Sequence, residues 1–277
     1  MKFKIVADAS CDIPEEYLEK YDISIIPIEV AFGEEIYPEG LSKKEFYDKI
    51  ENTNLIPKTA MPNAYKFEQF YKDYANKEDV FVFTIVISME LSQTKIQAQN
   101  AADSLGMKNV FIEESGCTTV AQGAIICELC KYMEKEQSVE KIIKEFYRLK
   151  SKCKLYAAIN DLKYLKNSGR LSSSSAVIGS MLNVKPIVSI VDGKVVNIKK
   201  CMGANQADQF MFSQIKQIDP KHDFYYIHSD NIPAVDKLRE KYNSKLPKGQ
   251  KITTCEIGCV VGSHVGPRCY GFVYFEK

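Results

Sequence analysis

Small hydroxyl side chains recur where buried strands are predicted to end and helices to begin. Ser10 follows the apolar run FKIVA, Ser92 follows VFVFTIVI, and Thr118 or Thr119 follows VFI. The carboxyl ends of parallel strands meet at one edge of a sheet, and open α/β sheets bind ligands there. Helix N-termini add unpaired N–H groups and partial positive charge, so this edge favours a carboxylate or a phosphate. The alternative for each hydroxyl taken alone is an ordinary helix cap.

Cysteine is the second residue type that could carry chemistry, and the chain contains nine. An odd number in a long chain without an export signal favours reduced thiols over a disulfide framework. Cys127 and Cys130 form a single C-x-x-C inside a predicted helix, which favours a structural role because no second pair or nearby histidine completes a zinc site. Cys11 and Cys117 lie near predicted helix starts, where a thiolate is favoured, so a redox role stays open.

The three histidines, His222, His228 and His264, are too few and too dispersed in sequence to predict a metal site. His222 is expected to be a surface turn residue. The chain lacks the motifs G-x-G-x-x-G, G-x-x-x-x-G-K-[ST], H-E-x-x-H and G-x-S-x-G. Standard nucleotide-binding, zinc-protease and hydrolase functions therefore have no support, and we expect neither a catalytic residue nor a metal ion.

The composition is that of a globular protein with a substantial core. The chain has 277 residues, of which 45% are hydrophobic and 26% are charged, and we expect two domains that meet near residue 150. A formal net charge of +1 offers no excess of cations for a nucleic-acid backbone. No apolar stretch approaches the roughly 18 residues of a membrane helix, and the N-terminus lacks a signal-peptide core. We expect a cytoplasmic protein that binds no nucleic acid and has no integral membrane segment.

The first predicted domain, residues 1–150, repeats one pattern three times: an apolar run, a turn rich in hydroxyls and acids, and an amphipathic helix. Unbroken apolar strands are typical of a parallel sheet that helices cover on both faces, so this half is predicted to be an α/β domain. Several residues predict helix boundaries. They are Asp12 with Pro14, the Ser42 to Glu45 capping box, Asn63, Ser92 and Gly106.

The second predicted domain, residues 151–277, has a different character. Asp192-Gly193 between KPIVSIV and KVVNIKK predicts a two-residue β-hairpin. A helix from about Ala204, the strand FYYIHSD, another helix and strands around ITTCEI and YGFVYF follow. This order predicts an α+β domain with a mixed sheet.

A series of segments resembles, in order, the signatures of the DegV family. These are IVADASCDIP, KTAMP, ISMELSQT, YLKNSGRL with NVKPIVSIVDGKV, and HVGP, and together they span essentially the whole chain. The resemblance implies a carrier that binds a long-chain fatty acid in an apolar tunnel between the two domains. In many bacteria such a protein presents its lipid to a separate ATP-dependent kinase that makes acyl phosphate. The fatty acid is then the expected ligand, with no other cofactor.

The resemblance also implies roles for four residues. Thr59 in KTAMP and Ser92 in ELSQT match the hydroxyls that bind the carboxylate. Arg170 in NSGRL and His264 in SHVGP match basic positions near the pocket mouth, which would assist acyl transfer or phosphate handling by the partner. Without the family, Arg170 would be interpreted as a solvated loop charge and His264 as a turn residue.

The chain departs from the family pattern at several places, which implies a different pocket rim and weakens the phosphate-handling role. S-G-T-Y reads Ser92-Gln93-Thr94-Lys95, T-S-Q-P reads Thr59-Ala60-Met61-Pro62, G-P-G reads Gly266-Pro267-Arg268, and Cys201 and Met202 stand where an arginine is common.

Two other functions stay open at this point. The family fold resembles subunits of sugar phosphotransferase and dihydroxyacetone kinases, so the first alternative is a phosphotransfer or kinase-related component that acts on a small molecule. His264 or His228 would then be the phosphoacceptor. The second alternative is a redox or regulatory binding module that uses the cysteines.

Overall fold

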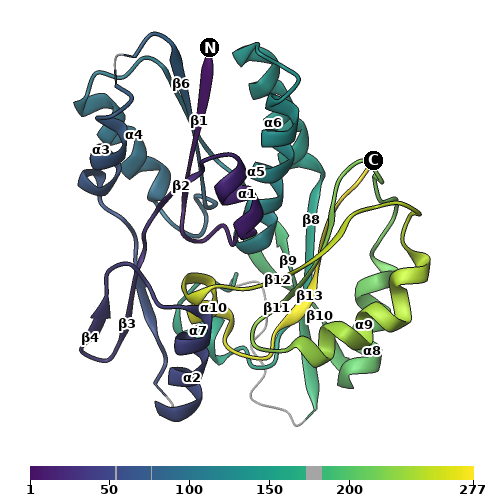
Figure 1. Ribbon diagram of the computed structural model, residues 1–277. Helices are drawn as coiled ribbons and strands as arrows, with labels where there is room; N and C mark the ends of the chain where they lie inside the picture. Colours follow the sequence, from purple (N-terminus) through teal and green to yellow (C-terminus); the bar gives the residue numbers. More distant parts are fainter. Residues whose placement is uncertain (54, 76, 173–182) are drawn as a thin grey trace.

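The computed structural model describes residues 1–53, 55–75, 77–172 and 183–277. Within these residues the strands form three sheets: a four-stranded parallel sheet, a six-stranded mixed sheet and a three-stranded antiparallel sheet (Figure 1). Among the described residues, no helix combines the length and the apolar character needed to cross a membrane.

The parallel sheet occupies the N-terminal half and has the strand order β2-β1-β6-β7. Alternate strand residues point to opposite faces, so Val6 and Val82 pack under α3 and α4 whereas Ile5 and Phe83 pack under α5 and α6. Figure 1 shows these two helix pairs on opposite sides of the sheet. The elements are β1 (Lys2–Asp8), α1 (Glu15–Lys20), β2 (Ser24–Ile26), α3 (Ala64–Tyr71), β6 (Val80–Val86), α4 (Thr94–Ser104), β7 (Val110–Glu114), α5 (Thr119–Met133) and α6 (Val139–Lys152).

The mixed sheet occupies the C-terminal half and has the strand order β10-β9-β8-β13-β11-β12. Helices α8 and α9 cover one face through a cluster that includes Phe224 and Phe272. The elements are β8 (Cys153–Ala158), α7 (Lys163–Asn167), β9 (Val184–Val191), β10 (Lys194–Met202), α8 (Gly203–Ser213), β11 (Phe224–His228), α9 (Ile232–Tyr242), the 3-10 turn η1 (Asn243–Lys245), β12 (Ile252–Glu256), α10 (Cys259–Val265) and β13 (Tyr270–Phe275).

Helix α5 packs against both large sheets. One hydrophobic cluster joins Val120 and Ile125 of this helix to Ile85 of the parallel sheet and to Leu155 and Val273 of the mixed sheet. The helix is therefore buried on nearly all sides, which explains why AQGAIICELC carries so few polar residues.

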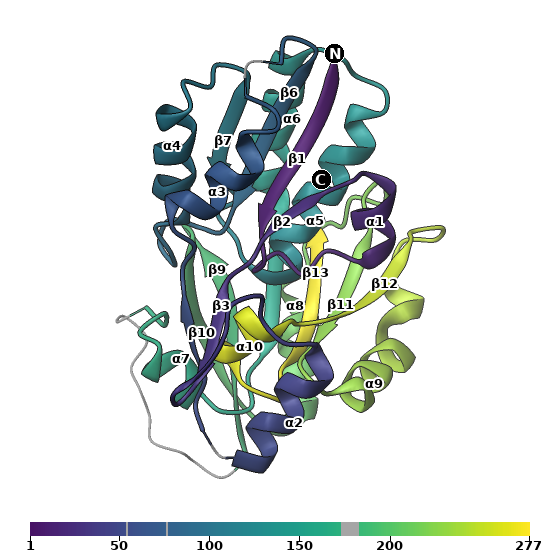
Figure 2. The same ribbon diagram turned by 60° about the vertical axis from the view of Figure 1, so that its left-hand side comes forward.

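A small sheet that the sequence did not predict lies beside the C-terminal elements. Its strand order is β4-β3-β5, and with α2 it packs on α7 and α10 through Phe32, Phe46, Tyr164 and Val260 (Figure 2). The elements are β3 (Glu29–Phe32), β4 (Glu35–Tyr37), α2 (Lys43–Thr53) and β5 (Lys58–Ala60). The chain passes from the parallel to the mixed sheet between α6 and β8, and the domain boundary near residue 150 stays a prediction.

The predicted fold class is confirmed: a mainly parallel α/β half precedes an α+β half with a mixed sheet. The predicted hairpin also forms, with Val191 opposite Lys194. Asp192 and Gly193 have φ angles of 49° and 78°, as a type I′ turn requires.

Three of the predicted helix boundaries are confirmed. Asn63 accepts a hydrogen bond from the Lys66 amide, and Ser42 and Glu45 form the reciprocal capping box. Gly106 follows α4 with a positive φ of 61°, as predicted.

Two predicted caps are wrong. The Asp12 carboxylate accepts from the Thr119 hydroxyl and the Gly258 amide and so joins distant segments rather than capping α1. Helix α4 begins at Thr94, two residues beyond Ser92, because the Ser92 amide closes a turn onto the Ser88 carbonyl.

Candidate functional site

A cavity of about 590 Å³ is lined by residues from both halves of the chain. Thr59, Ser92, Arg170 and His264, the four residues that the resemblance assigns to the site, all line it. They come from four separate segments, so the fold brings together side chains that are far apart in the sequence.

Each of the four side chains is held by a different local structure. Thr59 lies in β5, opposite Val30 of β3, and His264 lies in the last turn of α10. Ser92 lies in the turn between β6 and α4. Arg170 follows α7, and its backbone amide donates to the Leu165 carbonyl.

Thr59 and His264 are in direct contact. Their Oγ1 and Nε2 atoms lie 3.0 Å apart. Burial, together with the charge of nearby Arg170, lowers the pKa of His264 to about 4, so the imidazole is neutral at pH 7. Its Nδ1 atom is buried and has no hydrogen-bond partner within the described part of the chain. A neutral imidazole carries one N–H, so the tautomer decides whether the ring donates to Thr59 or accepts from it.

Two hydrogen bonds hold the turn that carries Ser92 to the edge of the parallel sheet. The buried Asp8 carboxylate accepts from the Ile87 amide at 2.7 Å, and the Cys117 carbonyl accepts from the Ser88 amide at 2.9 Å. The Ser92 hydroxyl lies 2.8 Å from that of Thr94. Ser92 therefore lies in a turn that is hydrogen-bonded to the edge of the parallel sheet, and it lines the cavity.

The wall of the cavity is mainly aliphatic. The apolar lining residues are Ile28, Met61, Ile87, Met89, Leu91, Leu165, Val195, Val260, Val261 and Val265. Met61 and Met89 are 46% and 37% exposed and so border the opening, whereas Val260 and Val261 are buried. Small-molecule binding sites are typically apolar cavities with a few polar groups.

The hydroxyls predicted at the sheet edge do not all reach this cavity. Thr118 lines it, at the N-cap position of α5 and without a side-chain capping bond. Ser10 is fully buried and bonds to Asp8 and Gln122, so it has a structural role.

The other two histidines lie elsewhere. His222 lies in a turn, as predicted, because its amide donates to the Asp219 carbonyl. The prediction of a surface position is wrong, since the side chain is only 11% exposed and its Nδ1 lies 2.7 Å from Glu128 Oε2. His228 is buried in β11, where burial lowers its pKa to about 4.

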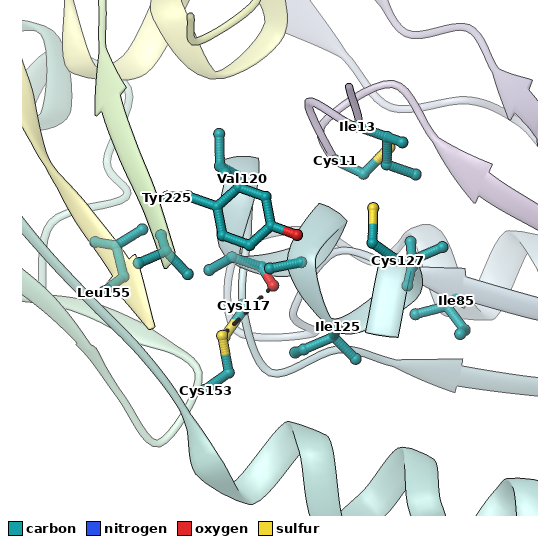
Figure 3. Close-up of a cluster of buried hydrophobic side chains, with 14 of the residues drawn as sticks. Cys11, Ile13, Ile85, Cys117, Val120, Ile125, Cys127, Cys153, Leu155 and Tyr225 are labelled. Atoms are coloured by element: carbon teal, nitrogen blue, oxygen red, sulfur yellow. Dashed lines mark hydrogen bonds between the residues drawn. The ribbon is translucent and has the colours of Figure 1, made fainter. Parts of the chain in front are cut away.

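All nine cysteines are free thiols and are buried. Cys127 packs in the central hydrophobic cluster (Figure 3), and Cys130 belongs to the same cluster, which agrees with a structural C-x-x-C. The expectation that Cys11 favours a thiolate is wrong, because burial and nearby Asp8 raise its pKa well above the ordinary value. Among the described residues, no group of three or more His, Cys, Asp or Glu side chains could hold a metal ion.

Sequence reasoning missed the short helix α10, which supplies Val260, Val261, His264 and Val265 to the cavity. At seven residues it is too short for a clear apolar period. The available signal was the glycine that ends it: Gly266 has a φ of 72°, which glycine adopts at low cost.

Comparisons with known proteins agree on one family. A model described as "Uncharacterised protein, DegV family" matches residues 2–277. Protein DegV of Bacillus subtilis is 28% identical over 283 residues, covering all of both chains. A DegV domain-containing protein of Clostridium acetobutylicum is also 28% identical and covers 100% of this chain and 99% of its own.

Solved structures share the fold along the whole chain. The Bacillus subtilis DegV structure, titled a fatty acid binding protein, has a TM-score of 0.85 at 28% identity, with complete coverage of both chains. A DegV family protein from Thermus thermophilus, whose title names fatty acid binding, has a TM-score of 0.89 at 24% identity, also with complete coverage. Since the family match extends over nearly every residue, this chain belongs to the DegV family.

Proposed function

We propose that this protein is a cytoplasmic carrier that binds a long-chain fatty acid, with the alkyl chain in the cavity and the carboxylate held by Thr59 and Ser92. The observation that carries the proposal is the cavity itself: an aliphatic wall lined also by both hydroxyls, Arg170 and His264. The fatty acid binding named for the Bacillus subtilis relative, which is similar over its full length, supports the same ligand.

Burial of the alkyl chain would supply most of the affinity. Each buried methylene contributes about 0.8 kcal/mol, so a long chain gains many kcal/mol before the entropy of association is subtracted. The headgroup contributes less, since its hydrogen bonds to the protein replace those to water. Its role is to fix the orientation and to keep the carboxylate from being buried unpaired, which would be costly.

The Thr59–His264 pair suits a carboxylate. With the proton on Nε2, the neutral imidazole donates to Thr59 Oγ1, and the threonine hydroxyl proton is then free to point at the ligand. Ser92 supplies a second neutral donor. Hydrogen bonds to an ionised acceptor are roughly twice as strong as neutral ones, so two such donors stabilise the anion without a buried countercharge.

The second part of the proposal is that the carrier presents its carboxylate to a separate ATP-dependent kinase, which forms the acyl phosphate. Arg170 supports this part, because it is exposed where it lines the cavity and so adds positive charge near the headgroup. Met202 is exposed and Cys201 is buried where the family often has an arginine, so these two positions offer no charge to such a partner.

The phosphohistidine alternative gains no support from the geometry. His228 is buried and does not line the cavity, and the Nε2 atom of His264 lies against Thr59. A phosphoacceptor histidine must expose a ring nitrogen to the phosphate donor. His228 is buried, and in His264 the Nε2 atom contacts Thr59 while the Nδ1 atom is buried.

Mass spectrometry of the purified protein tests the proposal. The intact protein, sprayed under non-denaturing conditions, should carry an added mass that organic extraction identifies as a long-chain fatty acid. Protein stripped of lipid should bind added hexadecanoate with one-to-one stoichiometry. Absence of both the co-purified lipid and the saturable binding would contradict it.

A further inference from the structure

Cys117 and Cys153 lie together where the two large sheets meet. Cys117 follows β7 of the parallel sheet, and Cys153 is the first residue of β8 in the mixed sheet. Figure 3 shows the two side chains next to each other, and after burial the neighbouring Cys117 is the largest cause of the raised pKa of the Cys153 thiol. The Cys153 thiol also lies 3.6 Å from the Ala121 carbonyl oxygen, to which it donates. Neighbouring thiols are the arrangement from which a disulfide forms.

The pair can be reached from solvent. Both cysteines line a surface hollow of about 560 Å³, and they are 6% and 7% exposed. Burial raises the pKa of the Cys153 thiol well above its ordinary value, and the positive charge of Lys154, which lines the same hollow, offsets part of this shift. Cys127, by contrast, has no exposed surface. A small oxidant therefore has a path to Cys117 and Cys153 that it lacks to Cys127.

We propose that Cys117 and Cys153 are a redox modification site, at which hydrogen peroxide converts the two thiols into a reversible disulfide. The Cys117 thiol loses its proton and attacks one peroxide oxygen, the O–O bond breaks, and the released hydroxide takes up that proton to become water. The resulting Cys117 sulfenic acid is attacked by the Cys153 sulfur. The S–O bond breaks and a second water leaves with the Cys153 proton. Two thiols thus lose two protons and two electrons, and the peroxide gains them.

The crosslink would act on the neighbouring cavity, a consequence that rests on the proposed function. The Cys117 carbonyl holds the Ser88 amide at 2.9 Å, and Thr118 lines the cavity. Met89 and Glu90 line both the hollow and the cavity. A disulfide at Cys117 would fix the turn that leads to Ser92 and join it to the mixed sheet. We expect the release of bound fatty acid to slow several-fold.

Peptide mapping tests the site without any reference to lipid. Full-length protein is treated with a small excess of hydrogen peroxide, free thiols are alkylated, and the protein is digested without reduction. The expected product is a crosslinked peptide pair that joins Cys117 to Cys153, is 2 Da lighter than the two thiol peptides and disappears with dithiothreitol. Cys127→Ser should retain this product, and Cys117→Ser and Cys153→Ser should abolish it. No crosslink, or a crosslink confined to other cysteines, would overturn the proposal.

The rate of fatty acid release then tests the link to the cavity. Reduced and oxidised protein, each loaded with a fluorescent fatty acid, are mixed with excess unlabelled lipid. Slower release in the oxidised protein, absent in Cys153→Ser, supports the coupling. If the mapped disulfide forms and release is unchanged, the site stands and its coupling to the cavity is overturned. If the protein binds no lipid, the proposed function fails and the mapped crosslink still decides the site.

Discussion

Thr59 Oγ1 and His264 Nε2 lie 3.0 Å apart, although 205 positions separate them in the chain. One residue belongs to the small sheet and the other to α10, and these two elements pack together. The contact therefore depends on the complete fold. It joins a neutral, buried imidazole to a hydroxyl that lines an apolar cavity, and the first predictions concern the two ends of this contact.

Removing either hydroxyl should weaken fatty acid binding and leave the fold intact. Thr59→Val and Ser92→Ala each delete one donor to an ionised group, worth about 1.5–3 kcal/mol, so we expect Kd to rise about ten- to hundredfold. Titration calorimetry or fluorescent lipid displacement measures the change. Thr53→Val and Ser213→Ala alter exposed hydroxyls that do not line the cavity and serve as matched controls. Equal affinity in all four variants would falsify the assignment of the carboxylate site.

The lipid-free protein should lose stability in mild acid partly through His264. Its pKa is about 4 in the folded state, below the ordinary value of about 6.5. Between these values the unfolded chain binds a proton that the folded protein does not, so the free energy of unfolding falls as pH falls from about 6.5 to 4. The contribution is at most about 1.4 kcal/mol per pH unit.

Urea unfolding of wild type and His264→Gln at several pH values isolates this contribution, because His228 titrates alike in both proteins. We expect the variant to show a shallower decline below pH 6.5. Parallel curves for the two proteins would mean that His264 is not held neutral by the fold.

Asp12 should have the opposite effect on stability. Burial raises its pKa to about 6, so the folded protein holds a proton that the unfolded chain has already lost. Stability from this group is fully present below about pH 4 and is lost as pH rises through about 6. Asp12→Asn keeps an acceptor for the Gly258 amide and cannot ionise. Between pH 4 and 7 its unfolding free energy should lack the decline that Asp12 contributes, as denaturant titration at pH 4.5 and 7 will measure.

A larger side chain in the cavity should block the ligand without disrupting the core. Val195 lines the cavity, whereas Val235 is fully buried on the face of α9 that packs on the mixed sheet. In Val195→Phe the added ring can enter open space, so we expect loss of lipid binding with less than about 1 kcal/mol of destabilisation. Val235→Phe must overpack a filled region, which typically costs 1–3 kcal/mol. Binding assays and thermal melts of both variants test this contrast. Full lipid binding by Val195→Phe would show that the ligand lies elsewhere.

Local chemistry explains which parts of the fold were predictable. The Asp192-Gly193 hairpin and the Asn63 cap are decided by a few adjacent residues, and both form as predicted. Helix α10 and the small sheet depend on packing between segments far apart in the chain, and the one local signal, the glycine that ends α10, does not by itself predict a helix. Asp12 illustrates the difference, since its side chain looks like a cap in sequence yet bonds to Thr119 and Gly258.

Only part of the candidate site could be predicted from the sequence, because local patterns do not record contacts between distant segments. Ser92 could be inferred from its place after a buried strand, although α4 begins later than expected. The sequence around Thr59 and around His264 gives no sign of a site, because their role depends on a contact between distant segments. They were predicted as site residues only from the order of the family motifs along the chain. Met61 and Met89, which border the opening, were not identified as site residues, since a lone methionine has no signature in sequence.

The position of α5 makes the two sheets depend on each other. Because a single helix supplies apolar surface to both, removing either sheet would expose one side of it to water. Neither half of the chain is then expected to fold when expressed alone, and the intact protein should unfold in one calorimetric transition rather than two. Evolution could not exchange one half for that of another protein without rebuilding this shared helix.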